Sequence, residues 1–151
     1  MKILVTGGAG FIGSHIVDRM LSEGHEVTVL DLWESDEMKA HSDNPNFQFV
    51  LGNTLDDDLV DGLVSGKDRV IHMAAVLGTS ETITTYDVEQ VAEVNVVGTV
   101  KMLKLCRKHK VGRVLIPTTP DVTWLNPYKI TKAAIEKFAE LFSENYGVEA
   151  V

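Results

Sequence analysis

The stretch KILVTGGAGFIGSH, residues 2–15, decides the fold of this chain. Its first five residues form an apolar run that stops at two glycines, which is typical of a buried strand. The residues that follow, 11–24, carry apolar side chains at helical spacing and end at Gly24. The sequence therefore predicts a strand, a tight glycine turn and a helix in immediate succession.

Three glycines of this turn, Gly7, Gly10 and Gly13, have the spacing G-x-x-G-x-x-G. One glycine permits the sharp turn, another lets a pyrophosphate approach the backbone, and the third lets the helix pack close to the strand. The free N–H groups at the helix start, including those of Phe11 and Ile12, lie at the positive end of the helix dipole and can hold phosphates. Because a strand precedes the turn and a helix follows it, the motif favours dinucleotide binding. A Walker-type phosphate loop is excluded, since no Gly-Lys-Ser/Thr follows.

Asp31 ends the second apolar run, EVTVLD, residues 26–31. An acid about 20 residues past a glycine turn can accept hydrogen bonds from the ribose hydroxyls of adenosine. It would repel a 2′-phosphate, so NAD is favoured over NADP. The alternative is a solvated loop acid, which would be the better interpretation if the glycine turn were absent.

Apolar runs and helical patterns alternate along the rest of the chain. Strands are predicted at 47–52, 68–75 and 113–117, and 148–151 has the look of an opening sixth strand. Helices are predicted at 54–64, 84–109 and 127–146, with 32–46 as a loop. The first of these helices should open at Thr54, because TLDD (54–57) has the form of a capping box with Asp in place of Glu. The alternation predicts an α/β fold, a Rossmann-type doubly wound parallel sheet in one domain, 1–151.

Composition restricts the partners and the compartment. The chain has 151 residues and a formal net charge of −8, which argues against a nucleic-acid partner and against a polybasic membrane-surface segment. No apolar stretch approaches the roughly 20 residues that a membrane span needs. Cys106 is the only cysteine, and no histidine stands at a metal-binding spacing from it. We therefore expect a cytoplasmic protein with no metal site.

Tyr128 and Lys132 lie in the stretch WLNPYKITKAAIEKF, residues 124–138. Asn126 can cap a helix there and Pro127 suits its first turn, which puts the two side chains one turn apart on the same face. A nearby cation, from Lys132 and a nicotinamide, would lower the tyrosine pKa from its usual value of about 10. Such a tyrosine can take a hydroxyl proton while hydride leaves the same carbon for NAD. Without the glycine turn, a surface pair would be the better interpretation.

Four motifs in this order resemble the extended short-chain dehydrogenase/reductase family, and within it the NAD-dependent epimerase/dehydratase branch, which acts on nucleotide sugars. They are VTGGAGFIGSH (5–15), HMAA (72–75), NVVGT (95–99) and YKITK (128–132). The resemblance spans nearly the whole chain. It implies an NAD-dependent epimerase similar to UDP-glucose 4-epimerase. A dehydratase, a decarboxylase, a plain dehydrogenase and a non-catalytic NAD(P)-binding module remain alternatives.

The resemblance also implies roles for individual residues. Tyr128 would be the acid/base, and Lys132 would also hold the nicotinamide ribose. The substrate hydroxyl would bond to a Ser or Thr after the fifth strand, where Thr119 in PTTP aligns best and Thr118 is close behind. Asn95 would brace the active site.

Further cofactor contacts are implied with less specificity. Ala74 and Ala75 are small enough to let the backbone approach NAD, although a strand end packed on the core is an equal alternative. Asn53, followed by Thr54, stands where the family often has an acid that contacts adenine. Trp33 could lie near the adenine, but packing as an exposed loop residue is the better interpretation.

Two features depart from the family pattern. Thr119 and Tyr128 are nine positions apart, whereas most nucleotide-sugar epimerases and dehydratases carry a longer insertion there, and Asp121 receives no role. The family places its sugar-nucleotide pocket largely after the sixth strand, so the fold is expected to be truncated before a C-terminal substrate-binding region. The family often forms homodimers through the helices expected here at 84–109 and 127–146.

Overall fold

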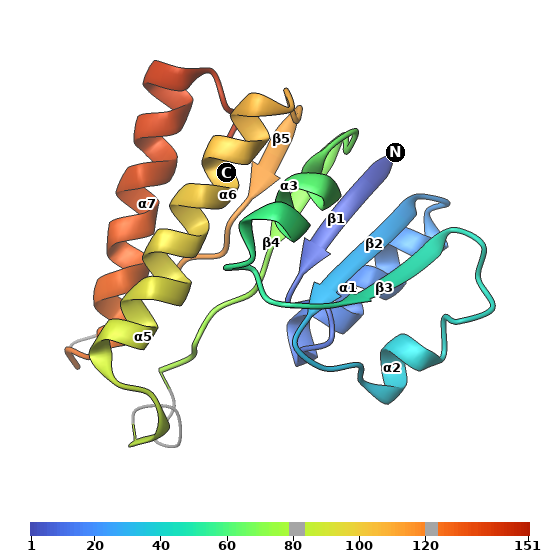
Figure 1. The fold of residues 1–151 in the computed structure, drawn as a ribbon, viewed down its shortest axis with the longest axis horizontal. Coiled ribbons are helices and arrows are strands. Elements are labelled where there is room, and N and C mark those ends of the chain that lie inside the picture. The colour runs from blue at the N-terminus through green and yellow to red at the C-terminus, as the bar shows by residue number, and fades with distance from the viewer. Residues whose placement is uncertain (79–83, 120–123) are drawn as a thin grey trace.

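A parallel five-stranded sheet with the strand order β3-β2-β1-β4-β5 forms the centre of the molecule (Figure 1). The computed structural model describes residues 1–78, 84–119 and 124–151. The strands are β1 (Lys2–Thr6), β2 (Glu26–Asp31), β3 (Phe47–Leu51), β4 (Arg69–His72) and β5 (Arg113–Leu115). The helices are α1 (Phe11–Ser22), α2 (Asp36–Lys39), α3 (Asp57–Val64), α5 (Val88–Ala92), the π-helix η1 (Glu93–Val97), α6 (Gly98–Lys108) and α7 (Pro127–Tyr146).

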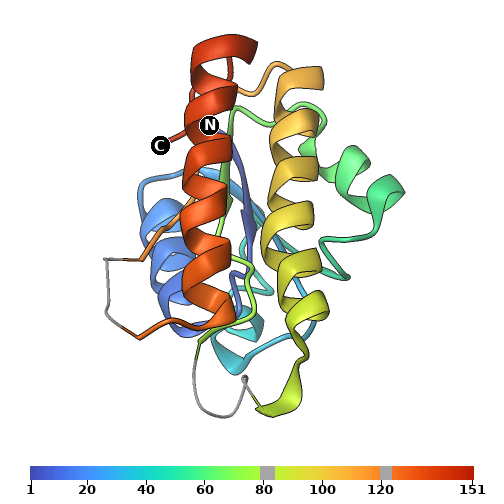
Figure 2. The same cartoon turned by 90° about the vertical axis from the view of Figure 1, so that its left-hand side faces the viewer.

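Helices cover both faces of the sheet, which confirms the predicted doubly wound fold. Successive strand residues point to opposite faces. Ile3 and Val5 of β1 pack in a cluster with Val17 of α1, while Leu4 packs on the other face in a cluster with residues of α3, α6 and α7. Figure 2 shows α6 and α7 side by side on their face, with α1 on the far side of the sheet. The strands read as continuous apolar runs because both faces are buried.

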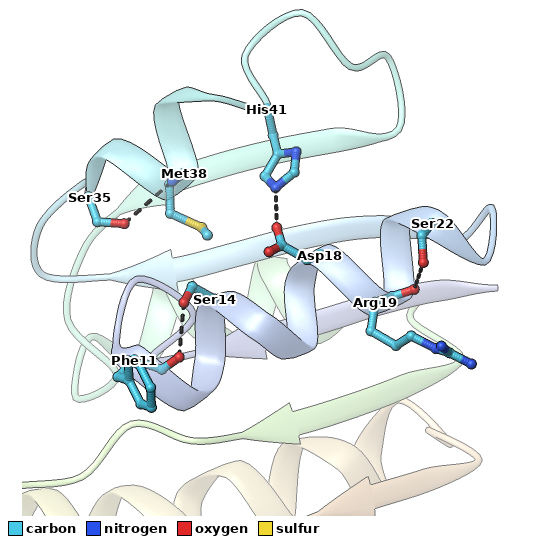
Figure 3. Close-up of polar contacts among 8 residues, drawn as sticks. All are labelled: Phe11, Ser14, Asp18, Arg19, Ser22, Ser35, Met38 and His41. Carbon is cyan, nitrogen blue, oxygen red and sulfur yellow. Dashed lines mark hydrogen bonds and ion pairs between the residues drawn. The ribbon is translucent and has the colours of Figure 1, made fainter.

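The region 32–46 contains a short helix, so its assignment as a loop was wrong. The hydroxyl of Ser35 accepts a hydrogen bond from the Met38 N–H at 3.4 Å and caps α2 (Figure 3). Met38 is fully buried against the α1 face of the sheet. His41, just after this helix, lies with Nε2 2.7 Å from Asp18 Oδ1 on α1. One buried methionine and one capping serine therefore hold an otherwise polar segment.

Helix α3 starts two residues later than a Thr54 cap requires, so that capping prediction was wrong. Asp56 is the N-cap, and its carboxylate accepts from the Leu59 N–H at 3.1 Å. The Asn53 side chain accepts from the Leu55 N–H at 3.0 Å, which holds 53–55 in a turn. An Asx turn of this kind competes with helix formation, and the next available acid then caps the helix.

The long helix expected at 84–109 begins at Val88 and is interrupted by η1. The carboxylate of Asp87 forms a reciprocal capping box with Gln90 at its start. Helix α7, in contrast, runs over 127–146 as predicted, with Asn126 accepting from the Lys129 N–H at 2.9 Å and Gly147 in the left-handed region at its end. No helix in the part of the chain that the structure describes has the length and apolarity to cross a bilayer.

Strands β4 and β5 are shorter than predicted, and 149–151 pair in parallel with β5. The Val151 N–H donates to Val114 O at 2.9 Å, and the Ile116 N–H donates to Val151 O at 2.9 Å. An isolated parallel bridge joins Val114 to Ala150. The chain therefore opens a sixth parallel strand here, as expected from its sequence.

Candidate active site

The site lies where the chain reverses its direction of travel across the sheet. From β1 the chain continues to β2 and β3 on one side, and it then returns to β4 on the other side of β1. After β1 the chain turns into α1, and after β4 it continues as residues 73–78. In open α/β sheets, ligands bind in the crevice at such a switch point.

The glycine turn allows two close approaches between backbone segments. Gly7 has a φ of +69°, and a Cβ there would lie 2.6 Å from the backbone nitrogen of Ala74. A Cβ on Gly13 would lie 2.8 Å from Gly8 Cα, so this glycine lets α1 pack onto the turn. Around Gly10 the nearest such contact is an ordinary 3.4 Å, which leaves its outer side open. The turn and packing roles therefore belong to Gly7 and Gly13, and Gly10 offers the open backbone that a pyrophosphate requires.

The amino end of α1 offers hydrogen-bond donors without a side-chain cap. Gly10 is the N-cap and carries no side-chain oxygen. The first-turn N–H groups of Phe11, Ile12 and Gly13 precede the first regular helical bonds and carry the positive end of the dipole. Ser14 is turned back toward the helix, with its hydroxyl donating to Phe11 O at 2.9 Å (Figure 3). Phe11 itself is 83% exposed, so this end of the helix faces solvent.

Asp31 lies beside the glycine turn, as its place at the end of β2 predicts. Its Oδ2 accepts from the Ala9 N–H at 2.9 Å and its Oδ1 accepts from the Leu32 N–H at 2.7 Å. These bonds orient the carboxylate and leave one lone pair on each oxygen. Asn53 follows β3 on the same edge of the sheet and is exposed, while Thr54 is half-buried. Trp33 is exposed, in agreement with the loop interpretation.

A buried histidine holds the start of the segment that continues from β4. His72 Nδ1 lies 2.7 Å from Thr6 Oγ1, and His72 Nε2 lies 3.2 Å from Thr99 Oγ1. Thr6 Oγ1 also accepts from the Ala74 N–H at 3.3 Å. Burial, with a smaller effect of the Lys132 charge, lowers the pKa of His72 to about 4. A neutral imidazole thus links β1, β4 and α6 by hydrogen bonds, two residues before Ala74 in the chain.

Sequence reasoning did not identify the role of His72. The signal was present, since a histidine inside an apolar strand needs buried partners. Its two partners, however, are 66 and 27 positions away in the chain. Only the register between β1 and β4 brings Thr6 beside it.

Tyr128 and Lys132 occupy the first turns of α7, and the structure places them on one face. The Lys132 side chain is 3% exposed, and its Nζ donates to Pro117 O at 2.9 Å. The same Nζ lies 5.6 Å from the centroid of the Tyr128 ring. Lys132 therefore joins α7 to the segment after β5, beside the tyrosine.

The pKa of Tyr128 does not shift in the direction expected from its lysine neighbour. Burial raises the pKa of the Tyr128 phenol, and burial lowers the pKa of Lys132 to about 8. The ammonium is engaged with a backbone carbonyl, and it faces the ring from a distance at which desolvation of the phenol dominates. Burial therefore outweighs the Lys132 charge at the phenol, and a lowered Tyr128 pKa beside both Lys132 and a bound nicotinamide remains a prediction.

The segment after β4 packs against Tyr128 on another side. A Cβ on Gly78 would lie 2.9 Å from Tyr128 Cβ, so the chain after β4 packs directly on the tyrosine. Thr118 and Thr119 follow β5, where Thr118 is exposed and Thr119 is half-buried. Asp121 lies outside the described residues.

Asn95 sits in the π-helix and is 1% exposed. Its Oδ1 accepts from the Val76 N–H at 2.7 Å, and its Nδ2 donates to Val76 O and to Thr131 Oγ1, both at 3.0 Å. These three bonds join η1, the segment after β4 and α7. Asn95 thus has the bracing role expected of it, while Thr131 is a second polar residue that sequence reasoning missed.

The chain shares its fold and its motifs with a family of known proteins. Residues 3–151 match the sequence model of the NAD dependent epimerase/dehydratase family. A UDP-glucose 4-epimerase of Halalkalibacterium halodurans is 36% identical over 169 residues, which cover 100% of this chain and 49% of that protein.

Two solved structures show the same arrangement of elements. The UDP-glucose 4-epimerase of Thermotoga maritima, determined with UDP-glucose, is 28% identical with a TM-score of 0.84 over 99% of this chain and 53% of that one. A dTDP-glucose 4,6-dehydratase of Streptomyces venezuelae, determined with NAD bound, is 29% identical with a TM-score of 0.84 over 99% of this chain and 54% of that one. The chain spans about half the length of these relatives.

The close approach at Gly7 predicts a large cost for any side chain there. Gly7→Ala should lower the free energy of unfolding by about 2–5 kcal/mol, from backbone strain and from overpacking against Ala74. It should also weaken NAD binding, measured by calorimetry. Gly24→Ala is the matched control, because Gly24 also has a positive φ, +79°, but open space around it. This control should lose only about 1–2 kcal/mol and keep its affinity for NAD. Equal losses in both variants would contradict the proposed close approach.

The buried neutral His72 predicts a loss of stability in acid. The unfolded chain protonates this histidine below its ordinary pKa of 6.5, whereas the folded chain does so only near 4. Between these values the unfolded state binds more protons, so the free energy of unfolding falls as the pH decreases through this range. Urea unfolding of wild type and His72→Gln at several pH values measures the effect. The wild type should lose stability relative to the variant between pH 6.5 and 4, and parallel curves would contradict the assignment.

Proposed function

The chain belongs to the NAD-dependent epimerase/dehydratase family, and we propose that it forms the NAD-binding domain, 1–151, of a nucleotide-sugar epimerase. Transient oxidation of the sugar at one carbon would allow inversion there, as in a UDP-glucose 4-epimerase. The observation that carries this proposal is that Tyr128 and the buried Lys132 lie on one face of α7, with Tyr128 against the segment that continues from β4.

The residues around the glycine turn fit NAD. The N–H groups at the start of α1 and the open side of Gly10 suit its diphosphate. Asp31, oriented by Ala9 and Leu32, suits the hydroxyls of the adenosine ribose and disfavours a 2′-phosphate. Asn53 and Thr54 would flank the adenine from the end of β3. Ala74 and Ala75 would let the backbone approach NAD, and Lys132 would hold the nicotinamide ribose.

Tyr128 is the proposed acid/base. When bound, NAD would supply the acceptor for the hydride that leaves the sugar carbon and the source of hydride for the second half of the reaction. In its phenolate form, Tyr128 Oη would take the proton as the O–H bond of the substrate hydroxyl breaks and the carbon–oxygen double bond forms. It gives the proton back to the same oxygen in the second half of the reaction. Thr119 would donate to or accept from that oxygen and hold it beside Tyr128.

Because burial raises the pKa of Tyr128, the proposed mechanism needs positive charge beside the phenol to form the phenolate. A phenol that burial holds protonated is a poor base at neutral pH. Lys132 supplies the nearest positive charge, 5.6 Å from the ring centroid. A dehydratase or decarboxylase would use the same proton transfer, and the dehydratase relative makes this the second candidate. A non-catalytic NAD-binding module is disfavoured by the intact Tyr128 and Lys132 pair.

We also propose that the whole protein is a homodimer through α6 and α7. A groove of about 570 Å³ runs between these helices. Its lining combines apolar and basic side chains, namely Val100, Lys104, Arg107, Lys108, Phe138, Leu141, Phe142 and Tyr146. Leu141 and Tyr146 are exposed there, and a second copy would remove them from water. With a single buried cysteine, a reducing cytoplasm remains the proposed compartment.

Removal of the Tyr128 hydroxyl tests the mechanism. Tyr128→Phe in the whole protein should lower kcat by at least about 100-fold, because general acid–base transfer contributes that much. Its affinity for NAD should stay within about threefold, because the ring and the glycine turn are unchanged. Turnover of UDP-glucose and calorimetric NAD binding measure the two quantities.

Tyr146→Phe is the matched control, because it makes the same change at the far end of the same helix. This variant should turn over at the wild-type rate. Retention of epimerase activity by Tyr128→Phe would rule out the proposed acid/base. Release of one NADH per substrate by the wild type would instead indicate a plain dehydrogenase.

A charge in the α6–α7 groove tests the dimer. Leu141→Arg should convert the whole protein from dimer to monomer in sedimentation velocity, since an unpaired charge would be buried at the interface. Leu51→Arg is the control, because Leu51 is also exposed but lies on the edge strand β3 at the opposite end of the sheet. A wild type that sediments as a monomer, or a Leu141→Arg variant that stays dimeric, would contradict the interface.

A further inference from the structure

Thr131 lies in the helical turn between Tyr128 and Lys132, yet it faces the interior and is 5% exposed. Its hydroxyl donates to Tyr128 O at 2.8 Å and accepts from Asn95 Nδ2 at 3.0 Å. The direction of both bonds is fixed, because a carbonyl can only accept and an amide nitrogen can only donate. The hydroxyl therefore links the backbone of Tyr128 to the π-helix.

Asn95 extends this link to the segment after β4. Both polar groups of the Val76 backbone bond to the Asn95 side chain, which fixes the orientation of the amide. The second hydrogen on Asn95 Nδ2 goes to Thr131. No buried side-chain polar atom in the described part of the chain lacks a partner, so this network is fully satisfied. Satisfied buried networks are rigid, because every alternative leaves a group unpaired.

The segment that Asn95 holds is also the surface on which Tyr128 rests. Two residues beyond Val76, a Cβ on Gly78 would lie 2.9 Å from Tyr128 Cβ and 3.0 Å from its Cδ1. The contacts thus form a closed circuit. Hydrogen bonds lead from the Tyr128 backbone through Thr131 and Asn95 to Val76, and the chain then continues to Gly78, which packs on the Tyr128 side chain. Both the helix that carries the phenol and the wall beside it are fixed to one amide.

The π-helix positions Asn95 within this circuit of contacts. Residues 93–97 form a turn with i→i+5 hydrogen bonds between α5 and α6. Such turns insert an extra residue, cost helical regularity and occur frequently at functional sites. Here the insertion holds Asn95 at a position from which it reaches Val76 and Thr131, which lie 19 and 36 residues away.

From this geometry we infer that Thr131 is a positioning residue for Tyr128, an inference that rests on the proposed acid/base role of that tyrosine. Its hydroxyl keeps the tyrosine backbone and the 76–78 wall in a single arrangement. Loss of the hydroxyl keeps the hydrogen bonds between Asn95 and Val76 but removes the bond that joins Asn95 to α7. A displacement of about 1 Å at a reacting group can cost up to about 100-fold in rate.

Three variants of the whole protein test the inference. Thr131→Val keeps the shape and should lower kcat by about tenfold or more, with the KM for the nucleotide sugar and the Kd for NAD within about twofold. Thr131→Ser restores the hydroxyl and should return kcat to within about threefold of wild type. Thr131→Ala also removes the hydroxyl but cannot overpack, so it replaces Thr131→Val if thermal unfolding shows that the valine variant does not fold.

Thr28→Val is the matched control. Thr28 is also a buried threonine, and its hydroxyl accepts from Lys67 Nζ at 2.7 Å, but it lies within β2 at a distance from α7. The control should lose stability and keep its kcat. If kcat in the Thr131 variants stays within about twofold of wild type, or if the serine variant is as slow as the valine variant, the inference fails.

A second readout does not depend on turnover, so it separates this inference from the proposed function. Tyrosinate absorbance is titrated in the wild type and in Thr131→Val, and the signal of Tyr128 is isolated by subtraction of Tyr128→Phe. Because burial raises the pKa of Tyr128, a loosened wall should lower it in the valine variant. An unchanged Tyr128 titration would overturn the positioning role even if the enzyme is active. A lowered Tyr128 pKa in a protein without epimerase activity would support the brace and remove only the proposed function.

Discussion

The close passage of Gly7 beneath Met73 and Ala74 is the contact on which the rest of the site depends. The backbone atoms of the two strand ends approach so closely that even a methyl group on Gly7 would overlap them. This approach brings the start of the 73–78 segment against the glycine turn that leads into α1. The N–H groups proposed to bind phosphate and the segment that packs on Tyr128 are therefore neighbours because of a single close contact between backbones.

Polar side chains, rather than apolar packing alone, fix the buried side of the candidate site. His72 joins two strands and α6, and Asn95 joins η1, the 73–78 segment and α7. A buried amide or a neutral imidazole satisfies partners in fixed directions, whereas apolar contacts tolerate sliding. Lys132 is the exception, because it keeps its amine buried on a single backbone carbonyl and has a lowered pKa. With a pKa of about 8, this ammonium still carries its charge at neutral pH but gives up its proton more readily than an exposed lysine.

The fold and the outer parts of the site follow from local signals in the sequence. Three glycines, the cap at Asn126 and the acid at the end of β2 each belong to a recognisable short pattern, and each lies where its pattern predicts. The inner parts do not follow, because their reasons are distant in the chain. The partners of Asn95 are 19 and 36 residues away, so a π-helix cannot be predicted from a helical pattern that continues unbroken. The helix α2 was missed for a similar reason, since a single methionine that packs on another element decides it.

The strand order has a consequence for how the chain must form its sheet. Strand β1 is synthesised before the other strands, but it occupies the middle of the sheet, and its bond partner on β4 lies 66 residues later. Until that partner arrives, one side of β1 offers unpaired N–H and C=O groups, which favour association with other nascent chains. Pairing over so long a separation is also slow. The site at the carboxyl ends of β1 and β4 consequently forms only after β4 has been synthesised and has paired with β1.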